Sequence, residues 1–185
     1  MYNFIAKLLT FFIFNKKLRK SIRQKIITFL YGHKIIRQAK KLGKGFICDG
    51  KSFINKNTYL GDFVRFNGMQ IHGEGKVTIG RNFHSGVECM IITQNHNFDN
   101  GTEIPFADND YIYKEVTIGD FVWLGSRVTI LPGTKIGEGA IIQGGAVVHG
   151  EIPPYAIVGG NPAKVFKYRN IEHFEKLKSE GKYEQ

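Results

Sequence analysis

The histidines are the side chains with the clearest chemical potential in this sequence of 185 residues. Three of the six, His72, His84 and His96, stand twelve residues apart. Imidazole changes protonation state near neutral pH, so it serves as a general base toward a hydroxyl group, and its neutral form binds metal ions. His96 lies in a polar stretch, residues 94–99, where a histidine with no other support is simply solvated. Whether each histidine is a general base, a metal ligand or only a solvated side chain depends on the elements that position it.

Composition limits the class of protein. A hydrophobic fraction of 42% with 22 Gly and only 5 Pro indicates a globular chain, neither disordered nor collagen-like. The length fits one domain, with or without an appendage. Two cysteines, Cys48 and Cys89, cannot build a disulfide framework or a four-cysteine zinc site. No run of 18 apolar residues occurs, so the sequence predicts no membrane-spanning helix.

The positive charge is confined to one end of the chain. The net charge is +10, yet residues 1–44 carry 9 Lys and 3 Arg with no Asp or Glu, so the rest of the chain is close to neutral. Apolar residues within this segment recur at helical spacing: Leu18, Ile22, Ile26, Phe29, His33 and Ile36. Residues 1–44 are therefore predicted to form a basic amphipathic helical segment.

Two interpretations of that segment stay open. A basic helix rich in Phe and Ile suits an anionic membrane surface, and it equally suits packing on the end of the main domain. Nucleic acid is disfavoured as a partner, because the aromatic residues sit on the apolar stripe and no recognition motif follows. No small-residue cleavage site follows the apolar residues 8–14, which argues against a secretory signal. We expect a cytoplasmic protein, and in the first interpretation residues 1–44 contact the inner face of the membrane.

The second periodicity in the chain is six. Aliphatic residues recur at this spacing without a break from residue 118 to residue 148, each preceded two positions earlier by a small or β-branched residue. The six aliphatic positions are Ile118, Leu124, Ile130, Ile136, Ile142 and Val148. The same pattern occurs earlier at Cys48, Ile54, Leu60 and Phe66, and after one extra residue at Ile79, Ser85 and Ile91.

A period of six fits neither a helix nor an isolated strand. It is typical of a solenoid in which each short strand and its turn add one flat face to a continuous core. The repeat is interrupted once, between Ile91 and Val116, so residues 97–115 are predicted to project as a long loop. Asn170 to Gln185 carry apolar residues at helical spacing, and residues 169–185 are predicted to form a short C-terminal helix.

The repeat also bears on metal binding. With eighteen residues per coil, histidines twelve apart fall on different faces of the solenoid. Cys89 falls on an inward-facing position, where it is predicted to be part of the core. We therefore expect no metal site.

Particular segments resemble a known family. The Ile-Gly repeats, together with VWLGS at 122–126, ILPG at 130–133 and the run from Ile152 to Lys164, resemble the hexapeptide-repeat acetyltransferases, most closely those that modify maltose, galactosides and polysaccharides. The resemblance covers residues 45–168. It implies an all-β solenoid, a left-handed parallel β-helix, assembled as a homotrimer.

The resemblance also implies roles for single residues. His96 matches a histidine at the start of the projecting loop that acts as general base in those enzymes. For acetyl-CoA, Ser126 and Gly144 match residues that touch coenzyme A, and Trp123 matches an aromatic residue at the thioester end. Lys164 and Lys167 match cationic positions near the nucleotide phosphates.

The acceptor side is supported by fewer residues. Asn67 and Glu74 match acceptor-contacting positions, although Asn67 aligns across the one-residue shift and Glu74 also suits a turn between two glycines. Phe106, Tyr111 and Tyr113 of the loop would stack on a sugar ring or only close the loop.

Together these features predict an acetyl-CoA-dependent O-acetyltransferase acting on a sugar or a polysaccharide precursor, with no metal cofactor. N-acylation of an amino sugar and a non-catalytic β-helical scaffold stay as alternatives. The basic segment adds the hypothesis that the acceptor is a lipid-linked glycan.

Overall fold

The hexad positions form the interior of a parallel β-solenoid. A computed structural model describes residues 16–183, with side chains from Lys20 onward. Side chains alternate between the two faces of a strand, so the residue two before each aliphatic position points inward with it. Both members of these pairs are buried along the repeat, for example Val116 with Ile118 and Val122 with Leu124. The six-residue period therefore predicted the core correctly.

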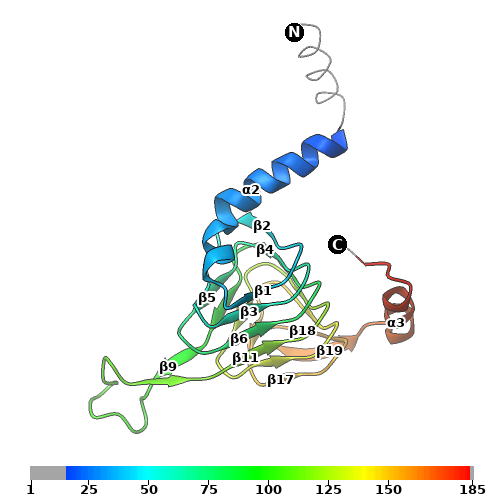
Figure 1. The fold of residues 1–185 in the computed structure, drawn as a ribbon. Helices are drawn as coiled ribbons and strands as arrows, with labels where there is room; N and C mark the ends of the chain where they lie inside the picture. Colours follow the sequence, from blue (N-terminus) through cyan, green and yellow to red (C-terminus); the bar gives the residue numbers. More distant parts are fainter. Residues whose placement is uncertain (1–15, 184–185) are drawn as a thin grey trace, which may run out of the picture.

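Three parallel sheets, here called walls A, B and C, enclose this core (Figure 1). Wall A contains β1 (Lys41–Leu42), β3 (Thr58–Leu60), β6 (Val77–Ile79), β11 (Val116–Ile118), β14 (Lys135–Ile136) and β17 (Glu151–Ile152). Wall B contains β2 (Ile47–Gly50), β4 (Arg65–Asn67), β7 (His84–Ser85), β12 (Trp123–Leu124), β15 (Ile141–Ile142), β18 (Ala156–Gly159) and the antiparallel β19 (Lys164–Tyr168). Wall C contains β5 (Gln70–His72), β8 (Met90–Ile92), β13 (Thr129–Ile130) and β16 (Val147–Val148).

The chain visits walls A, B and C in turn, so each coil stacks on the one before. The register is direct: Val116 pairs with Val77, and Ile118 pairs with Ile79. Like side chains therefore lie above one another, and the solenoid of about 7 turns has a continuous aliphatic interior.

The shift between the two hexad runs arises at two neighbouring corners. Buried Phe66 on wall B and buried Ile71 on wall C are five residues apart, and Ile71 and buried Ile79 on wall A are eight apart. The first spacing is therefore one residue shorter than a hexad and the second is two residues longer. Together they give the one extra residue seen in the sequence.

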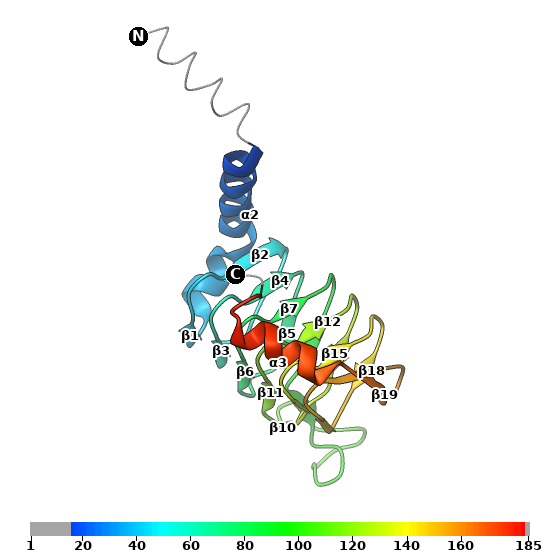
Figure 2. The ribbon, with the colours of Figure 1, turned by 90° about the vertical axis from the view of Figure 1, so that its right-hand side faces the viewer.

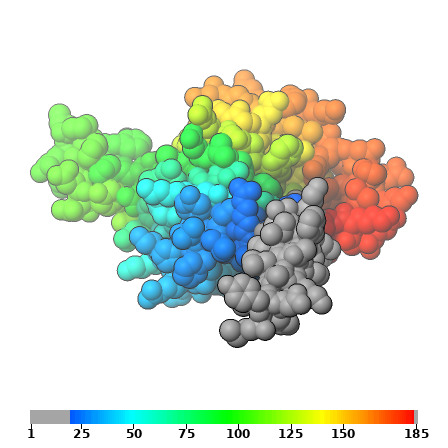
Figure 3. Space-filling model, turned by 90° about the horizontal axis from the view of Figure 1, so that it is seen from above, coloured from blue at the N-terminus to red at the C-terminus, as the bar shows by residue number. Residues whose placement is uncertain are grey.

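The single interruption of the repeat forms an arm, residues 94–113. Its base is a pair of antiparallel strands, β9 (Gln94–His96) and β10 (Tyr111–Tyr113), at the corner between walls C and A. The arm extends well away from the coils, on the opposite side of the solenoid from the C-terminal helix (Figures 1 and 3). It contains most of the loop predicted over residues 97–115.

Helix α2 (Lys16–Gln38) lies across the first coil and rises away from it toward its N-terminus (Figures 1 and 2). Gly32 and Ile35 are buried, and a Cβ on Gly32 would lie 3.0 Å from the Cys48 Cβ. The Cys48 backbone N–H donates to Thr28 Oγ1 at 3.2 Å. The helix packs on the end of the solenoid, but through a different face from the apolar stripe that the sequence singles out.

Helix α3 (Ile171–Ser179) packs outside the corner between walls A and B (Figure 2). Asn170 caps it by accepting a hydrogen bond from the His173 N–H at 2.9 Å. The Phe174 ring meets the Phe121 ring edge-on, with ring centroids 5.8 Å apart. Within residues 16–183, neither helix could cross a bilayer, because α2 is too rich in charge and α3 has only 9 residues.

Candidate active site

His96 lies at the base of the arm, where β9 ends. It stands opposite Tyr111 in the antiparallel ladder with β10. The imidazole stacks on the Phe106 ring with centroids 3.7 Å apart and planes 20° from parallel, and the Tyr111 ring lies 4.6 Å away. Two aromatic side chains of the arm therefore hold the ring in one orientation, a role that sequence reasoning did not assign to them.

The His96 Nδ1 atom is buried and has no hydrogen-bond partner within residues 20–183. Buried polar atoms in folded proteins are nearly always paired, so such an atom calls for an explanation. Asp99, which could have oriented the ring, is exposed. The nearby carboxylate of Asp110 instead accepts a hydrogen bond from the Asn97 side-chain amide at 2.8 Å. No group of residues 20–183 occupies this position, so Nδ1 is open to a water molecule, a ligand or another chain.

A hollow of about 410 Å³ opens beside the imidazole, against the outer face of wall C. Its lining includes His72, Ile92 and Gln94 as well as His96. A second hollow adjoins it, because Gly73, Gln94 and Tyr111 line both. Glu74 lies in the lining of this second hollow, so the structure brings Glu74 and His96 to the same corner of the solenoid. Gln94 was not predicted as a site residue from the sequence, because no repeat or motif includes it.

Ser126 and Gly144 form a different site, at the corner between walls B and C. They occupy equivalent turns of successive coils, and Gly145 N–H donates to the Ser126 carbonyl at 2.8 Å. A Cβ on neighbouring Gly125 would lie 2.5 Å from the Gly144 nitrogen, so the two coils approach too closely here for any side chain at that position. Both Ser126 and Gly144 are exposed, and this corner offers a ligand a narrow strip of backbone.

The other candidates for coenzyme A contact lie on wall B. Trp123 points outward from β12 with 50% of its side chain exposed. Lys164 and Lys167 are exposed on β19, at the far end of the same wall. Asn67 ends β4 at the corner between walls B and C, two coils before Ser126, and its backbone N–H donates to Ser85 Oγ at 3.2 Å.

The predicted site residues thus fall into two groups on one chain. The first, at the corner between walls C and A, is His96 and Glu74. The second, on wall B and its corner with wall C, is Asn67, Trp123, Ser126, Gly144, Lys164 and Lys167. Wall C separates the two groups, so a single chain does not bring His96 to the residues expected to hold coenzyme A.

The three histidines of the twelve-residue series do not meet at one place, since His72 and His96 line one hollow and His84 does not. His72 lies on wall C, His84 on wall B and His96 in the arm. No three or more His, Cys, Asp or Glu side chains within the described part of the chain are arranged to hold a metal ion. Cys48 and Cys89 are both buried in the solenoid interior, where removal from water raises the pKa of each thiol.

This burial predicts the reactivity of the two thiols. Because only the thiolate reacts and burial disfavours it, we expect both cysteines of the native protein to resist alkylation by iodoacetamide at pH 7.5 and to react after denaturation. Mass spectrometry of each cysteine-containing peptide measures this. Rapid labelling of Cys89 in the native protein would contradict the buried position of that side chain.

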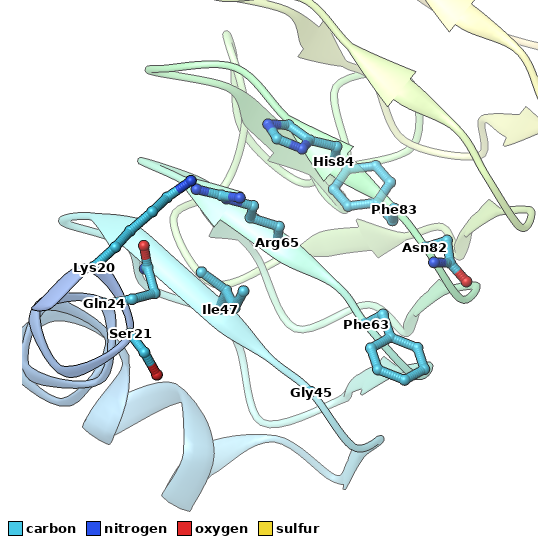
Figure 4. A pocket seen from close by; sticks show the side chains of 10 residues that line it. All are labelled: Lys20, Ser21, Gln24, Gly45, Ile47, Phe63, Arg65, Asn82, Phe83 and His84. Carbon is cyan, nitrogen blue, oxygen red and sulfur yellow. The ribbon is translucent and has the colours of Figure 1, made fainter. Parts of the chain in front are cut away.

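A further groove of about 390 Å³ lies between α2 and the first coils of wall B (Figure 4). Lys20 and Gln24 line it from the helix, and Arg65 and His84 line it from the wall. Asp49 accepts hydrogen bonds from both the Arg65 and the Gln24 side chains. None of the predicted site residues lines this groove.

Comparison with known proteins finds similar sequences and a similar fold. The family model described as bacterial transferase hexapeptide (six repeats) matches residues 115–150. WbbJ of Escherichia coli (strain K12), named as a lipopolysaccharide biosynthesis O-acetyl transferase, is 33% identical over 129 residues, which is 66% of this chain and 63% of that protein. Residues 115–150 therefore carry the hexapeptide repeat of bacterial transferases, and the chain is similar in sequence to WbbJ.

Other acetyltransferases are similar to the chain in sequence or in fold. YvoF of Bacillus subtilis (strain 168), named as an acetyltransferase, is 36% identical over 103 residues, covering 56% of this chain and 54% of that protein. The chain therefore spans between half and two thirds of the length of these two relatives. A galactoside acetyltransferase solved in complex with coenzyme A superposes with a TM-score of 0.64 at 24% identity, over 84% of both chains. The shared fold is the left-handed parallel β-helix.

Proposed function

We propose that this chain is an acetyl-CoA-dependent O-acetyltransferase, which transfers an acetyl group to a hydroxyl of a sugar or a polysaccharide precursor. The observation that carries the proposal is the placement of His96. Its imidazole contacts two aromatic rings and lies beside an open hollow, at the base of an arm on a rigid solenoid. The acetyl group and the O-acetyl chemistry are supported by the names of WbbJ and of the galactoside acetyltransferase.

In this proposal His96 is the general base. An alcohol is too weak an acid to attack a thioester unaided at neutral pH. As the acceptor oxygen bonds to the thioester carbon, the imidazole takes the hydroxyl proton, and it returns that proton to the thiolate when the C–S bond breaks. The products are the acetyl ester and the free thiol of coenzyme A. The buried Nδ1 leaves Nε2 for the proton transfer, and a hydrogen bond to Nδ1 from outside the chain would keep the ring in that tautomer.

The acetyl-CoA site is proposed at the corner between walls B and C. Ser126 and Gly144 would line the path of the pantetheine arm, and Trp123 would lie beside the thioester. Lys164 and Lys167, both exposed on β19, would meet the phosphates of the nucleotide.

A homotrimer would bring the two groups of residues together. Wall C separates His96 from Ser126 within one chain, so a complete site needs the arm corner of one subunit and the wall B corner of the next. A cyclic oligomer supplies this pairing once per subunit.

The acceptor is proposed to lie in the two adjoining hollows at the arm. Glu74 lines one hollow and His96 lines the other, and their shared Tyr111 offers an aromatic face to a sugar ring. Asn67 belongs to the opposite corner, so it would reach the acceptor from a neighbouring subunit.

A thiol-release assay tests this function. The purified full chain is incubated with acetyl-CoA and matched pairs of acceptors that differ only by a hydroxyl or an amino group at one sugar carbon. We expect coenzyme A release and an acetyl ester with the hydroxyl members. Release confined to the amino members would identify an N-acyltransferase instead, and neither turnover nor binding of acetyl-CoA would indicate a non-catalytic scaffold.

A further inference from the structure

The outer surface of α2 is an apolar stripe that the solenoid does not cover. Phe29, Leu30 and Ile26 have 69%, 59% and 54% of their side chains exposed, and Ile36 has 48%. Ile26, Phe29 and Ile36 follow the three- and four-residue spacing of one helical face, with Leu30 beside them. A neighbouring face, which carries Gly32 and Ile35, is the one that packs on the first coil. The stripe therefore needs a partner other than this chain's own core.

Cations flank the stripe on both sides. At about 100° per residue, Lys25 falls on one flank of Phe29, and Arg23 and Arg37 fall on the other. All three are exposed, and α2 contains no acidic residue. The first carboxylate in the whole sequence is that of Asp49. The helix thus presents unbroken positive charge around an apolar centre.

The apolar stripe and its flanking cations indicate what kind of partner would bind α2. We propose that α2 docks on an anionic lipid surface, with Ile26, Phe29, Leu30 and Ile36 inserted among the acyl chains and the flanking cations at the level of the headgroups. An amphipathic helix with these two features lies in the plane of the membrane interface. A second copy of α2 is a poorer partner, because packing two such stripes together would bring like charges into contact.

The orientation of α2 fits this occupant. The helix lies at the end of the solenoid and rises away from it, while the arm and α3 extend sideways (Figures 1 and 3). Docking would hold the hollows at His96 close to acceptors carried by lipid. This inference goes beyond acetyl transfer, and its test does not use turnover.

Vesicle sedimentation of the full chain tests the proposal. The probes are phosphatidylcholine vesicles with and without 30% phosphatidylglycerol, each at low and at physiological salt. We expect at least tenfold tighter binding to the anionic vesicles at low salt, since each cation near such a surface contributes about fivefold. The double variant Phe29→Asp, Leu30→Asp should lose binding at least tenfold, because it removes two apolar side chains from the interface.

Tyr31→Asp is the matched control. Tyr31 is exposed on the same helix but lies about 200° from Phe29, on the side away from the stripe. Binding of the Tyr31→Asp variant to the anionic vesicles should stay within about twofold of wild type. Equal sedimentation of wild type with both kinds of vesicle, or undiminished binding by the double variant, would overturn the proposal. So would a loss of the native oligomer, by light scattering, in the double variant alone, since that would make the stripe a contact between subunits.

Discussion

Replacing His96 with alanine should lower kcat for acetyl transfer by about 10²–10⁴ while leaving the affinity for acetyl-CoA within a few-fold of wild type. The expected decrease in kcat equals the usual contribution of a positioned general base. The selectivity follows from the proposed division of roles, because the contacts to acetyl-CoA are assigned to residues such as Ser126 and Gly144 and not to His96. Thiol release at saturating substrate measures kcat, and calorimetry measures the binding of acetyl-CoA.

His173→Ala serves as the control for this variant. His173 is exposed on α3, on the far side of the solenoid from the arm, and takes no part in the proposed site. Its kcat should match wild type. If His96→Ala also kept wild-type kcat, the imidazole would not be the base. A fall in acetyl-CoA affinity as large as the fall in kcat would mean that His96 binds the donor instead of moving a proton.

Mixing two inactive variants should restore about a quarter of the wild-type activity. One variant is His96→Ala, and the other is Gly144→Glu, which places a carboxylate at the exposed corner proposed for acetyl-CoA. In a randomly mixed trimer, a site that draws one residue from each of two subunits is intact in about one case in four. Each variant alone should have about 1% of wild-type activity or less.

The mixture is made by unfolding both variants together and refolding them, and thiol release is measured on the product. The same variants refolded separately and then combined provide the control, which should stay inactive as long as subunits do not exchange. If mass spectrometry detects mixed trimers and the activity is still absent, the site does not combine His96 and Gly144 from different chains. Such a result would remove the reason for proposing that assembly completes the site.

The interior of the solenoid was predictable because a single rule repeats along the chain. Every coil must bury one aliphatic residue and one small partner per wall, so Leu124, Ile130 and Ile142 reveal the period without any structure. The packing of α2 follows another rule. There, close approach to Cys48 selects Gly32 and Thr28, which carry little apolar signal, and the most hydrophobic face of the helix is left outside.

The candidate site was only partly predictable, for a related reason. His96 stands out because it lies where the repeat fails, but the aromatic rings that hold it come from residues 106 and 111, far along the arm. Their contact depends on how the arm folds back, which no short-range pattern encodes. The roles of Trp123, Ser126, Gly144, Lys164 and Lys167 came from resemblance alone, and they stay predictions. The groove beneath α2 combines residues from four elements, and no motif or repeat in the sequence predicts it.

The reversed direction of β19 has a consequence for association between solenoids. A stack of parallel strands ends in unpaired backbone groups, which could template another molecule and grow into a fibre. In wall B the place beside β18 is already taken by β19, which runs the opposite way, and α2 lies over β2 at the other end. A further coil cannot continue that ladder in register from either end. β19 and α2 thus oppose end-to-end polymerisation of the solenoid.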